Sequence, residues 1–297
     1  MENRRSRRIF TRTKKRARAL KRTLLKIKNG REGVMKYYLA IDIGASSGRH
    51  IVAHIENGKM ITEEIYRFQN GPEMLTAYDG EKHLMWTHER LFAEILNGLK
   101  KAKEVGKIPY AIGIDTWGVD YALLDENDEA VGGTYCYRDS RTESTIPAVH
   151  EIIPFADLYA KTGMRFASFD TVYQLLDDKK TGRMDKAKSM LMLPDYFHFR
   201  LTGVKKQEYC NATTTGMVNA KTHTWDEEIL EKLGYKKELF GELSQPGTEV
   251  GEFTDEVRNV FLNSIGYGRY KLKDEFNTQR KVVNYFATQE KNEKNSK

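Results

Sequence analysis

The chain has 297 residues, of which 39% are hydrophobic and 31% charged, enough for one large or two ordinary domains with an apolar core. No run approaches the ~18 consecutive apolar residues of a membrane span, so we predict no transmembrane helix. The two cysteines, Cys136 and Cys210, lack metal-site spacing and indicate no disulfide framework, which is typical of a protein of the reducing cytoplasm.

The formal net charge of +7 belongs to one end of the chain. Residues 1–34 hold 14 Lys and Arg against two Glu, a net charge of +12, so the remainder carries −5. This segment has few large apolar side chains, and we expect it to be disordered or weakly helical. Three interpretations are open: electrostatic contact with nucleic acid or an acidic membrane, an organellar transit peptide, or an extension upstream of Met35 as the true start. We favour the third, because the strand-patterned body begins immediately at Met35 and Lys36. We expect no nucleic-acid or membrane partner; the tail lacks interleaved aromatic residues and the remainder is acidic, which argues against nucleic-acid binding.

The most informative stretch begins with a buried strand. Residues 37–43 form a short apolar run rich in β-branched and aromatic side chains, interrupted by one acid, Asp42. Residues 44–48, Gly-Ala-Ser-Ser-Gly, predict a tight turn that can aim backbone N–H groups and two hydroxyls at an anion, and Arg49 opens a second strand. This pattern suits a phosphate held through a hydrated metal ion, although on spacing alone a plain β-hairpin is the commoner explanation. A strand follows the turn and no Gly-Lys-Ser/Thr is present, which excludes the dinucleotide-binding fingerprint and the Walker loop.

Further along, strand and helix signals together predict an α/β chain. The dipeptide at 57–58, Asn-Gly, predicts a hairpin turn, and residues 60–68 a third strand. Thr87 is expected to cap a helix whose apolar residues recur at helical spacing. Residues 110–115 predict another buried strand that ends in an acid. A Gly-containing turn at 116–118 and a returning strand follow it, and a second hairpin is the simplest explanation.

The second half of the chain carries weaker signals. Residues 145–186 predict helices and loops, and Asp195 is expected to cap a helix rather than to bind a ligand. The charged run 138–141 is interpreted as a surface salt-bridge cluster, and the hydroxyl-rich residues 211–215 as a loop that could line a cleft. The seven histidines show no metal-site spacing.

Five stretches together resemble the FGGY family of actin-like sugar kinases, in the family's order and at plausible intervals. They are AIDIGASSGR at 40–49, GIDTWGVD at 113–120, YRDSR at 137–141, LPDYF at 193–197 and NATTT at 211–215. The Ala-Ser-Ser-Gly-Arg form is similar to the rhamnulokinase branch in particular, and the resemblance covers about residues 36–257. It implies a ribonuclease H-like (actin-like ATPase) fold of the α/β class, with a mixed sheet flanked by helices and opened by a three-strand meander.

The resemblance also implies roles for individual residues. ATP with Mg2+ would be the cofactor, and Asp42 would organise the metal ion and its waters. The phosphate contacts would come from the turn and the residue after it: Ala45, Ser46, Ser47, Gly48 and Arg49. The sugar, L-rhamnulose, would meet Gly118, where the absence of a side chain lets the backbone approach a hydroxyl. Trp117 would wall the pocket, and Arg138 and Asp139 would form or brace it.

The resemblance fades after residue 257. We therefore expect a basic extension at 1–34, an FGGY-type N-terminal kinase domain at 35–257 and a divergent polar tail at 258–297 without strand–turn patterns. In the family a second domain supplies a His-Asp-Thr motif with the general base, a second phosphate loop and the adenosine pocket, and this sequence contains no His-Asp-Thr. The implied transfer of the γ-phosphate of ATP to the 1-hydroxyl of L-rhamnulose would be slow or absent in this chain alone. The alternatives are a non-catalytic half-kinase that binds sugar or nucleotide, and nucleic-acid binding through the basic tail.

Overall fold

The computed structural model describes residues 35–263 and 281–283. The chain divides into two units after Lys36, and the first unit contributes only two described residues, which lie in no helix or strand. The expected disorder of residues 1–34 falls outside the described residues. Every element below belongs to the second unit, and none of its described helices is long and apolar enough to cross a membrane.

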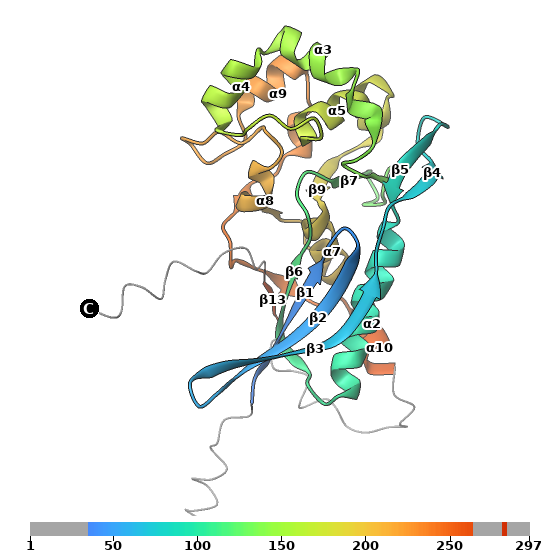
Figure 1. Cartoon of the computed structure of the whole chain (residues 1–297), viewed down its shortest axis with the longest axis vertical. Coiled ribbons are helices and arrows are strands. Elements are labelled where there is room, and N and C mark those ends of the chain that lie inside the picture. Colours follow the sequence, from blue (N-terminus) through green and yellow to red (C-terminus); the bar gives the residue numbers. More distant parts are fainter. Residues whose placement is uncertain (1–34, 264–280, 284–297) are drawn as a thin grey trace, which may run out of the picture. The chain divides into compact units, whose positions relative to one another are not determined.

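The principal sheet has six strands in the order β12-β13-β6-β1-β2-β3 (Figure 1). Their bounds are β1 Tyr37–Ile43, β2 Ser47–Glu56, β3 Lys59–Gln69, β6 Pro109–Asp115, β12 Glu249–Glu252 and β13 Lys281–Val283. Strands β1, β2 and β3 form the predicted antiparallel meander. Asn57 and Gly58 turn the chain between β2 and β3 with positive φ values of 49° and 75°, which this dipeptide tolerates. Strand β6 runs parallel to β1, so the sheet is mixed, as predicted.

Two elements lie where the resemblance fades. Helix α10, Asp255–Asn263, runs across the predicted domain boundary at residue 257, and β13 pairs with both β6 and β12. The sequence did not predict a strand within 258–297. Its three residues gain their conformation by pairing with distant strands, which local periodicity does not reveal.

Helix α2, His88–Glu104, packs its apolar stripe against β2 and β3. The stripe consists of four buried residues: Leu91, Phe92, Ile95 and Leu99. Thr87 occupies the N-cap position, as predicted, but its side chain makes no capping hydrogen bond; its hydroxyl lies 3.4 Å from Glu73 Oε1 instead. Gly98 leaves room for the close approach, since a Cβ there would stand 2.1 Å from the His50 ring.

The chain leaves the principal sheet after β6, so the second expected hairpin is wrong. Strand β7, Tyr121–Leu124, pairs antiparallel with β9, Ser189–Met192, from much later in the chain. The helices predicted within 145–186 form around this pair: α3 Thr145–Ile152, α4 Phe155–Thr162, α5 Thr171–Lys180 and α6 Arg183–Lys186. With α9, Glu227–Leu233, they enclose a second cluster of buried apolar side chains.

The remaining elements have two to five residues, except α7, which has ten. They are β4 Glu73–Thr76, β5 Lys82–Trp86, β8 Thr134–Tyr135, α7 Leu193–Thr202, α8 Tyr209–Thr213, β10 Gln207–Glu208, β11 Leu243–Ser244 and the 3-10 turns Ser140–Thr142 and Lys237–Leu239. Because α7 begins at Leu193, Asp195 lies inside its first turn and the expected N-cap role is wrong. The Asp195 carboxylate instead accepts the Glu208 N–H at 3.1 Å.

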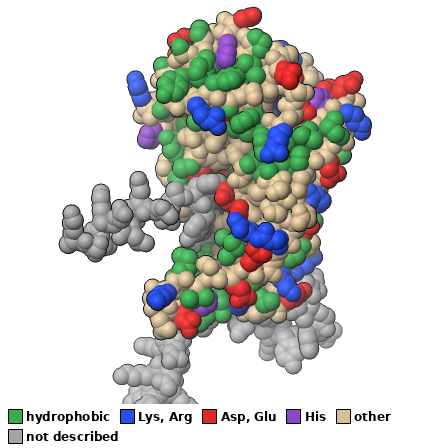
Figure 2. Space-filling model, in the orientation of Figure 1, with side chains coloured by type: hydrophobic (Ala, Val, Ile, Leu, Met, Phe, Trp, Pro, Cys, Tyr) green, Lys and Arg blue, Asp and Glu red, His purple; other side chains and the backbone are tan. Residues whose placement is uncertain are grey.

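Figure 2 shows how side chains are distributed on one face. Basic and acidic side chains of the described residues are interspersed there and gather into no basic patch. Apolar side chains are exposed over α3 and α4, where Ile152 and Tyr159 are 46% and 54% exposed. This part of the surface therefore offers a nucleic acid no continuous cationic track.

Candidate functional site

The turn between β1 and β2 is held in shape by residues from elsewhere in the chain. The Gly44 N–H donates to Ser47 O at 2.9 Å and closes the turn. Asn70 holds it from outside: its N–H donates to Ser46 O at 2.9 Å and its Nδ2 to Gly44 O at 2.8 Å. Arg90 donates to the side-chain oxygen of Asn70 at 3.0 Å. The Ser46 and Ser47 hydroxyls have no partner among the described residues, so they remain available to an anion.

Gly48 is needed at the end of this turn for space rather than for backbone freedom. It lies directly opposite Phe68 on β3, and a Cβ at Gly48 would stand 2.1 Å from the Phe68 ring. A side chain here would displace either the ring or the strand. The second glycine of Gly-Ala-Ser-Ser-Gly therefore keeps the turn seated on the sheet.

Asp42 and Arg49 face each other across β1 and β2 and form an ion pair. Arg49 Nε and Nη2 each lie 2.8 Å from Asp42 Oδ2. The two side chains are 39% and 46% exposed, so the pair contributes only about 0–1 kcal/mol to stability and is readily exchanged. A cation arriving at Asp42 would free Arg49 to face an anion.

Asp115 ends β6 beside Asp42, because β1 and β6 are parallel and these two residues are register partners. Burial and the negative charge of Asp42 raise the pKa of Asp115, and Asp115 Oδ1 is buried without a hydrogen-bond partner in the described structure. An orphaned carboxylate oxygen beside a second carboxylate fits a divalent cation that prefers oxygen ligands, such as Mg2+. Nowhere in residues 35–263 do three or more His, Cys, Asp or Glu gather as a metal site. A metal ion held by these two carboxylates would therefore need further ligands from other groups.

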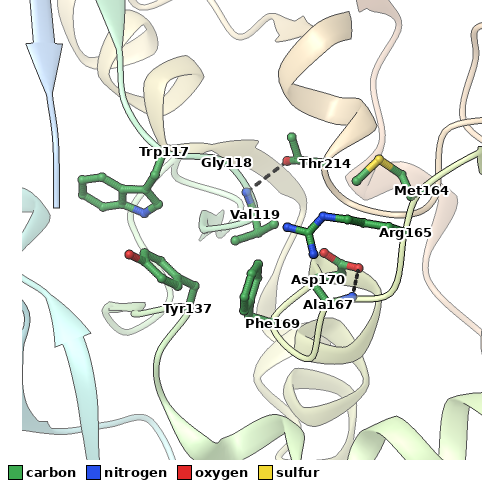
Figure 3. A pocket seen from close by; sticks show the side chains of 10 residues that line it. All are labelled: Trp117, Gly118, Val119, Tyr137, Met164, Arg165, Ala167, Phe169, Asp170 and Thr214. Atoms are coloured by element: carbon green, nitrogen blue, oxygen red, sulfur yellow. Dashed lines mark hydrogen bonds between the residues drawn. The ribbon is translucent and has the colours of Figure 1, made fainter.

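Two residues beyond Asp115 the chain enters a pocket of about 330 Å³ (Figure 3). Ten residues line it: Trp117, Gly118, Val119, Tyr137, Met164, Arg165, Ala167, Phe169, Asp170 and Thr214. Successive Cα atoms are 3.8 Å apart, so those of Asp115 and Gly118 lie within about 11 Å of each other. The pocket therefore adjoins the carboxylate pair.

Gly118 has no room for a side chain, because Thr214 occupies the space that a Cβ would take. A Cβ on Gly118 would lie 2.8 Å from Thr214 Oγ1, and that hydroxyl accepts the Val119 N–H at 3.0 Å (Figure 3). Val119 has a φ of 67°, which is strained for a β-branched residue. The Asp120 N–H donates across it to Gly118 O at 2.9 Å, so Val119 is the centre of a γ-turn.

Aromatic faces and one charged pair make most of the remaining wall. The rings of Trp117, Tyr137 and Phe169 lie along one side, with the last two edge-to-face at 5.6 Å between centroids (Figure 3). Arg165 extends from the other side near Asp170. Burial raises the pKa of Asp170 to about 7, against smaller opposing effects of a backbone hydrogen bond and of Arg165. Apolar walls with a few polar groups that fix orientation are typical of small-molecule sites.

The other two predicted sugar residues lie outside the set that lines the pocket. The Arg138 guanidinium stands over the Tyr137 ring, 5.3 Å from its centroid. Asp139 accepts the Leu84 N–H at 2.7 Å and lies 2.9 Å from His83 Nδ1. Both residues therefore adjoin the wall that Tyr137 forms, a position from which they can brace it.

Arg141, at the end of the same charged run, is not on the surface. Its guanidinium is buried and donates to Asp178 at 2.9 Å and to Gln174 at 2.8 Å. Asp178 also pairs with Arg183 at 2.9 Å. The interpretation of a surface salt-bridge cluster is wrong for this residue, and breaking such a buried pair typically costs about 3–5 kcal/mol.

Comparison with known proteins places the chain in a family. The FGGY family of carbohydrate kinases, N-terminal domain, matches residues 37–265. The chain belongs to this family. It is 46% identical over 235 residues to the rhamnulokinase of Halalkalibacterium halodurans, covering 78% of this chain and 48% of that protein. It is 39% identical over 219 residues to the rhamnulokinase of Bacillus subtilis, covering 74% and 44%. The chain thus spans about half the length of these relatives.

Solved structures of carbohydrate and glycerol kinases share the fold. A gluconate kinase from Lactobacillus acidophilus matches with a TM-score of 0.68 at 22% identity, over 85% of this chain and 48% of that one. A Plasmodium falciparum glycerol kinase with ADP matches with a TM-score of 0.62 at 16% identity, over 75% and 46%. The predicted ribonuclease H-like (actin-like ATPase) fold of this FGGY chain is confirmed.

Several residues of the FGGY site were missed by the sequence reasoning. Asp115 carried the same signal as Asp42, an acid at the end of a buried strand, but only the parallel pairing of their strands shows that they meet. Asn70 contacts Gly44 from 26 positions away, and Thr214 contacts the Gly118 turn from 95 positions after Val119. No local pattern could have revealed such partners.

Proposed function

We propose that this chain is the sugar- and phosphate-binding half of an ATP-dependent kinase that converts L-rhamnulose to L-rhamnulose 1-phosphate in rhamnose catabolism. One observation carries the proposal: the carboxylate pair adjoins a turn with free hydroxyls, since Asp42 lies two residues before that turn, and the Cα atom of Asp115 lies within about 11 Å of that of Gly118, which lines a pocket walled by aromatic rings. The relatives at 46% and 39% identity are named rhamnulokinases, which supports the choice of sugar.

The phosphate end of the site would take ATP with Mg2+. Asp42 and Asp115 would hold the metal ion, which neutralises phosphate charge and orients the transferring group. The phosphate oxygens would meet the turn residues Ala45, Ser46, Ser47 and Gly48, together with Arg49. Arg49 would exchange its partner from Asp42 to phosphate when the metal ion arrives, so that the local charge stays balanced.

The sugar would lie in the pocket after β6. The bare backbone at Gly118 would approach a hydroxyl, and the Trp117 ring would cover one face of the sugar. Asp170 and Arg165 would bond further hydroxyls, since both line the pocket. Arg138 and Asp139 would brace the wall rather than touch the sugar.

Turnover requires a general base, and the motif that carries it in the family is absent from this sequence. A sugar kinase needs a general base to accept the proton of the attacking hydroxyl, and the sequence has no His-Asp-Thr. We therefore expect L-rhamnulose binding with slow or no phosphorylation. A non-catalytic half-kinase that only binds its ligands is the alternative.

Isothermal titration of the full chain tests the proposal. We expect saturable binding of L-rhamnulose, and Mg2+-dependent binding of a non-hydrolysable ATP analogue that Asp42→Asn weakens at least tenfold without changing sugar affinity. Asp185→Asn, at a carboxylate 74% exposed and away from the site, is the matched control. Absence of saturable sugar binding would contradict the proposed sugar site. Rapid ATP-dependent phosphorylation that is lost on Asp42→Ala would contradict the expected slow turnover.

We also propose a cytoplasmic location without a nucleic-acid partner. Cys136 and Cys210 are free thiols, which suits a reducing compartment that also holds ATP and Mg2+. Fractionation of the expressing cells followed by immunodetection would test the location.

A further inference from the structure

Asp120, the last residue of the pocket turn, is surrounded by hydrogen-bond donors. Its side chain is fully buried. Oδ2 accepts Trp86 Nε1 at 2.6 Å, Trp117 Nε1 at 2.7 Å and the Tyr137 N–H at 3.1 Å, while Oδ1 accepts Gln174 Nε2 at 3.3 Å. No cationic side chain of the described residues pairs with it. Burial raises its pKa to about 6, because the hydrogen bonds only partly offset the lost hydration.

These neighbours require a carboxylate. An Asn at position 120 would replace one acceptor oxygen by an NH2 group, which would face a donor whichever way the amide turned. A buried charge without a counter-ion is destabilising, so the fold alone would be better served if the carboxylate and its side-chain donors were replaced together by apolar side chains. Two of the four donors, Trp117 and Tyr137, belong to residues that line the pocket. The carboxylate therefore joins two parts of its wall.

Gln174 extends the same scaffold to the rest of the pocket. Its Nε2 lies 2.9 Å from Phe169 O and 3.3 Å from Val119 O, and its Oε1 accepts Arg141 Nη2 at 2.8 Å. Val119 O also accepts the Thr171 hydroxyl at 2.6 Å. These contacts hold Val119 at its strained positive φ, a conformation that persists only where the surroundings enforce it.

We propose that Asp120 and Gln174 are positioning residues, which hold one wall of the sugar pocket rigid without touching the sugar. The inference rests on the proposed sugar site, and neither residue lines the pocket. Rigid support of this kind is what keeps contact groups within a fraction of an ångström of their productive positions. The competing explanation is a purely structural role, in which loss of either residue lowers stability but leaves the affinity of the folded protein unchanged.

Asp120→Asn and Gln174→Met in the full chain test the inference. Asp226→Asn is the matched control, since Asp226 is a buried acid that accepts the Ile229 N–H at 3.0 Å and lines no part of the pocket. Three quantities are measured under conditions where each variant is folded: urea unfolding, L-rhamnulose affinity and amide hydrogen exchange at Val119. The Val119 N–H bonds to Thr214 and to neither altered residue, so its exchange reports the turn itself.

We expect both pocket variants to weaken L-rhamnulose binding and to accelerate Val119 exchange, each at least tenfold, while the control changes neither. An unchanged rate of amide exchange at Val119 overturns the inference, whatever the effect on L-rhamnulose affinity. If the wild type binds L-rhamnulose, an unchanged affinity in a folded variant overturns it as well. If the wild type binds no sugar but Val119 exchange still rises, the proposed function fails and Asp120 still shapes the pocket. If Asp120→Asn does not fold, Gln174→Met decides alone.

Discussion

Gly118→Ala is the smallest change that tests the pocket turn. The added Cβ would lie 2.8 Å from Thr214 Oγ1, 2.9 Å from its Cγ2 and 3.0 Å from its Cβ. Thr214 cannot swing aside without loss, because its hydroxyl donates to Asn211 O at 2.7 Å and accepts the Val119 N–H at 3.0 Å. The turn must therefore move away from Thr214 and change the surface that the pocket offers.

The size of the effect follows from these distances. Lengthening the closest contact from 2.8 Å to an ordinary 3.4 Å requires a backbone shift of about 0.6 Å. Overpacking of this kind costs about 1–3 kcal/mol. That cost falls on the free and the sugar-bound protein alike, so the loss of affinity comes from the displaced contact with the sugar. A hydrogen bond contributes about 0.5–1.5 kcal/mol, and each 1.4 kcal/mol corresponds to a tenfold change in a dissociation constant, so we expect L-rhamnulose to bind roughly two- to tenfold more weakly.

Isothermal titration with L-rhamnulose measures the change, with circular dichroism as a check that the variant is folded. Gly71→Ala is the matched control: it adds the same methyl group where no heavy atom lies within 4 Å, so it should leave affinity unchanged. Equal sugar affinity of the wild type and Gly118→Ala would refute the assignment of this turn to the sugar.

Three further predictions concern stability, measured by urea unfolding. Burial lowers the pKa of His198 to about 4 from its ordinary 6.5, so its stabilising contribution is present above pH 6.5 and is lost as pH falls through 4. His198→Phe should therefore reduce the loss of stability between pH 8 and pH 4 by about 3 kcal/mol, and parallel pH profiles would contradict this. The raised pKa of Asp170 has the opposite effect, because the stability that its protonated carboxyl contributes is lost as pH rises through about 7. The free energy of unfolding of Asp170→Asn should therefore rise relative to that of the wild type between pH 4 and pH 8. A relative fall would be inconsistent with burial of the carboxyl. Gly98→Ala should destabilise by up to about 2 kcal/mol, because a clash with the His50 ring that costs about 1–3 kcal/mol outweighs a helix-propensity gain of about 1 kcal/mol. In a His50→Ala background the same change should stabilise, and a stabilising effect in the wild type would exclude the clash.

The parts of the site that the sequence predicted are those whose determinants are local. The strand at 37–43 and the turn after it depend on a run of apolar residues and two glycines within a dozen positions. The positive φ of Asn57 follows from its own side chain and the glycine after it. Trp117 and Gly118 were placed by the resemblance of one short motif to the sugar-kinase family rather than by local pattern, and both line the pocket.

The parts that could not be predicted depend on which distant segments meet. The buried strand Tyr121–Leu124 has the same local pattern whether it pairs with the preceding strand or with Ser189–Met192, and the structure shows the second. Asp195 fell inside a helix because α7 begins three residues earlier than the cap signal indicated. Gln174 reaches Asp120 from 54 positions away, so its place behind the pocket is a property of the fold rather than of any motif.

The six residues 115–120 join the two ends of the candidate site. Asp115 stands beside Asp42 at the end of a paired strand, and Asp120 is held by donors behind the pocket wall. Between them, the Val119 N–H is hydrogen-bonded to Thr214, and the Gly118 backbone packs closely against the same side chain. On the proposed roles, the separation of metal ion and sugar is set by this backbone rather than by flexible side chains. Because an attacking oxygen must come within about 3–3.5 Å of the atom it attacks, a shift of the sugar wall by a few tenths of an ångström would misalign the two reactants even if each still bound.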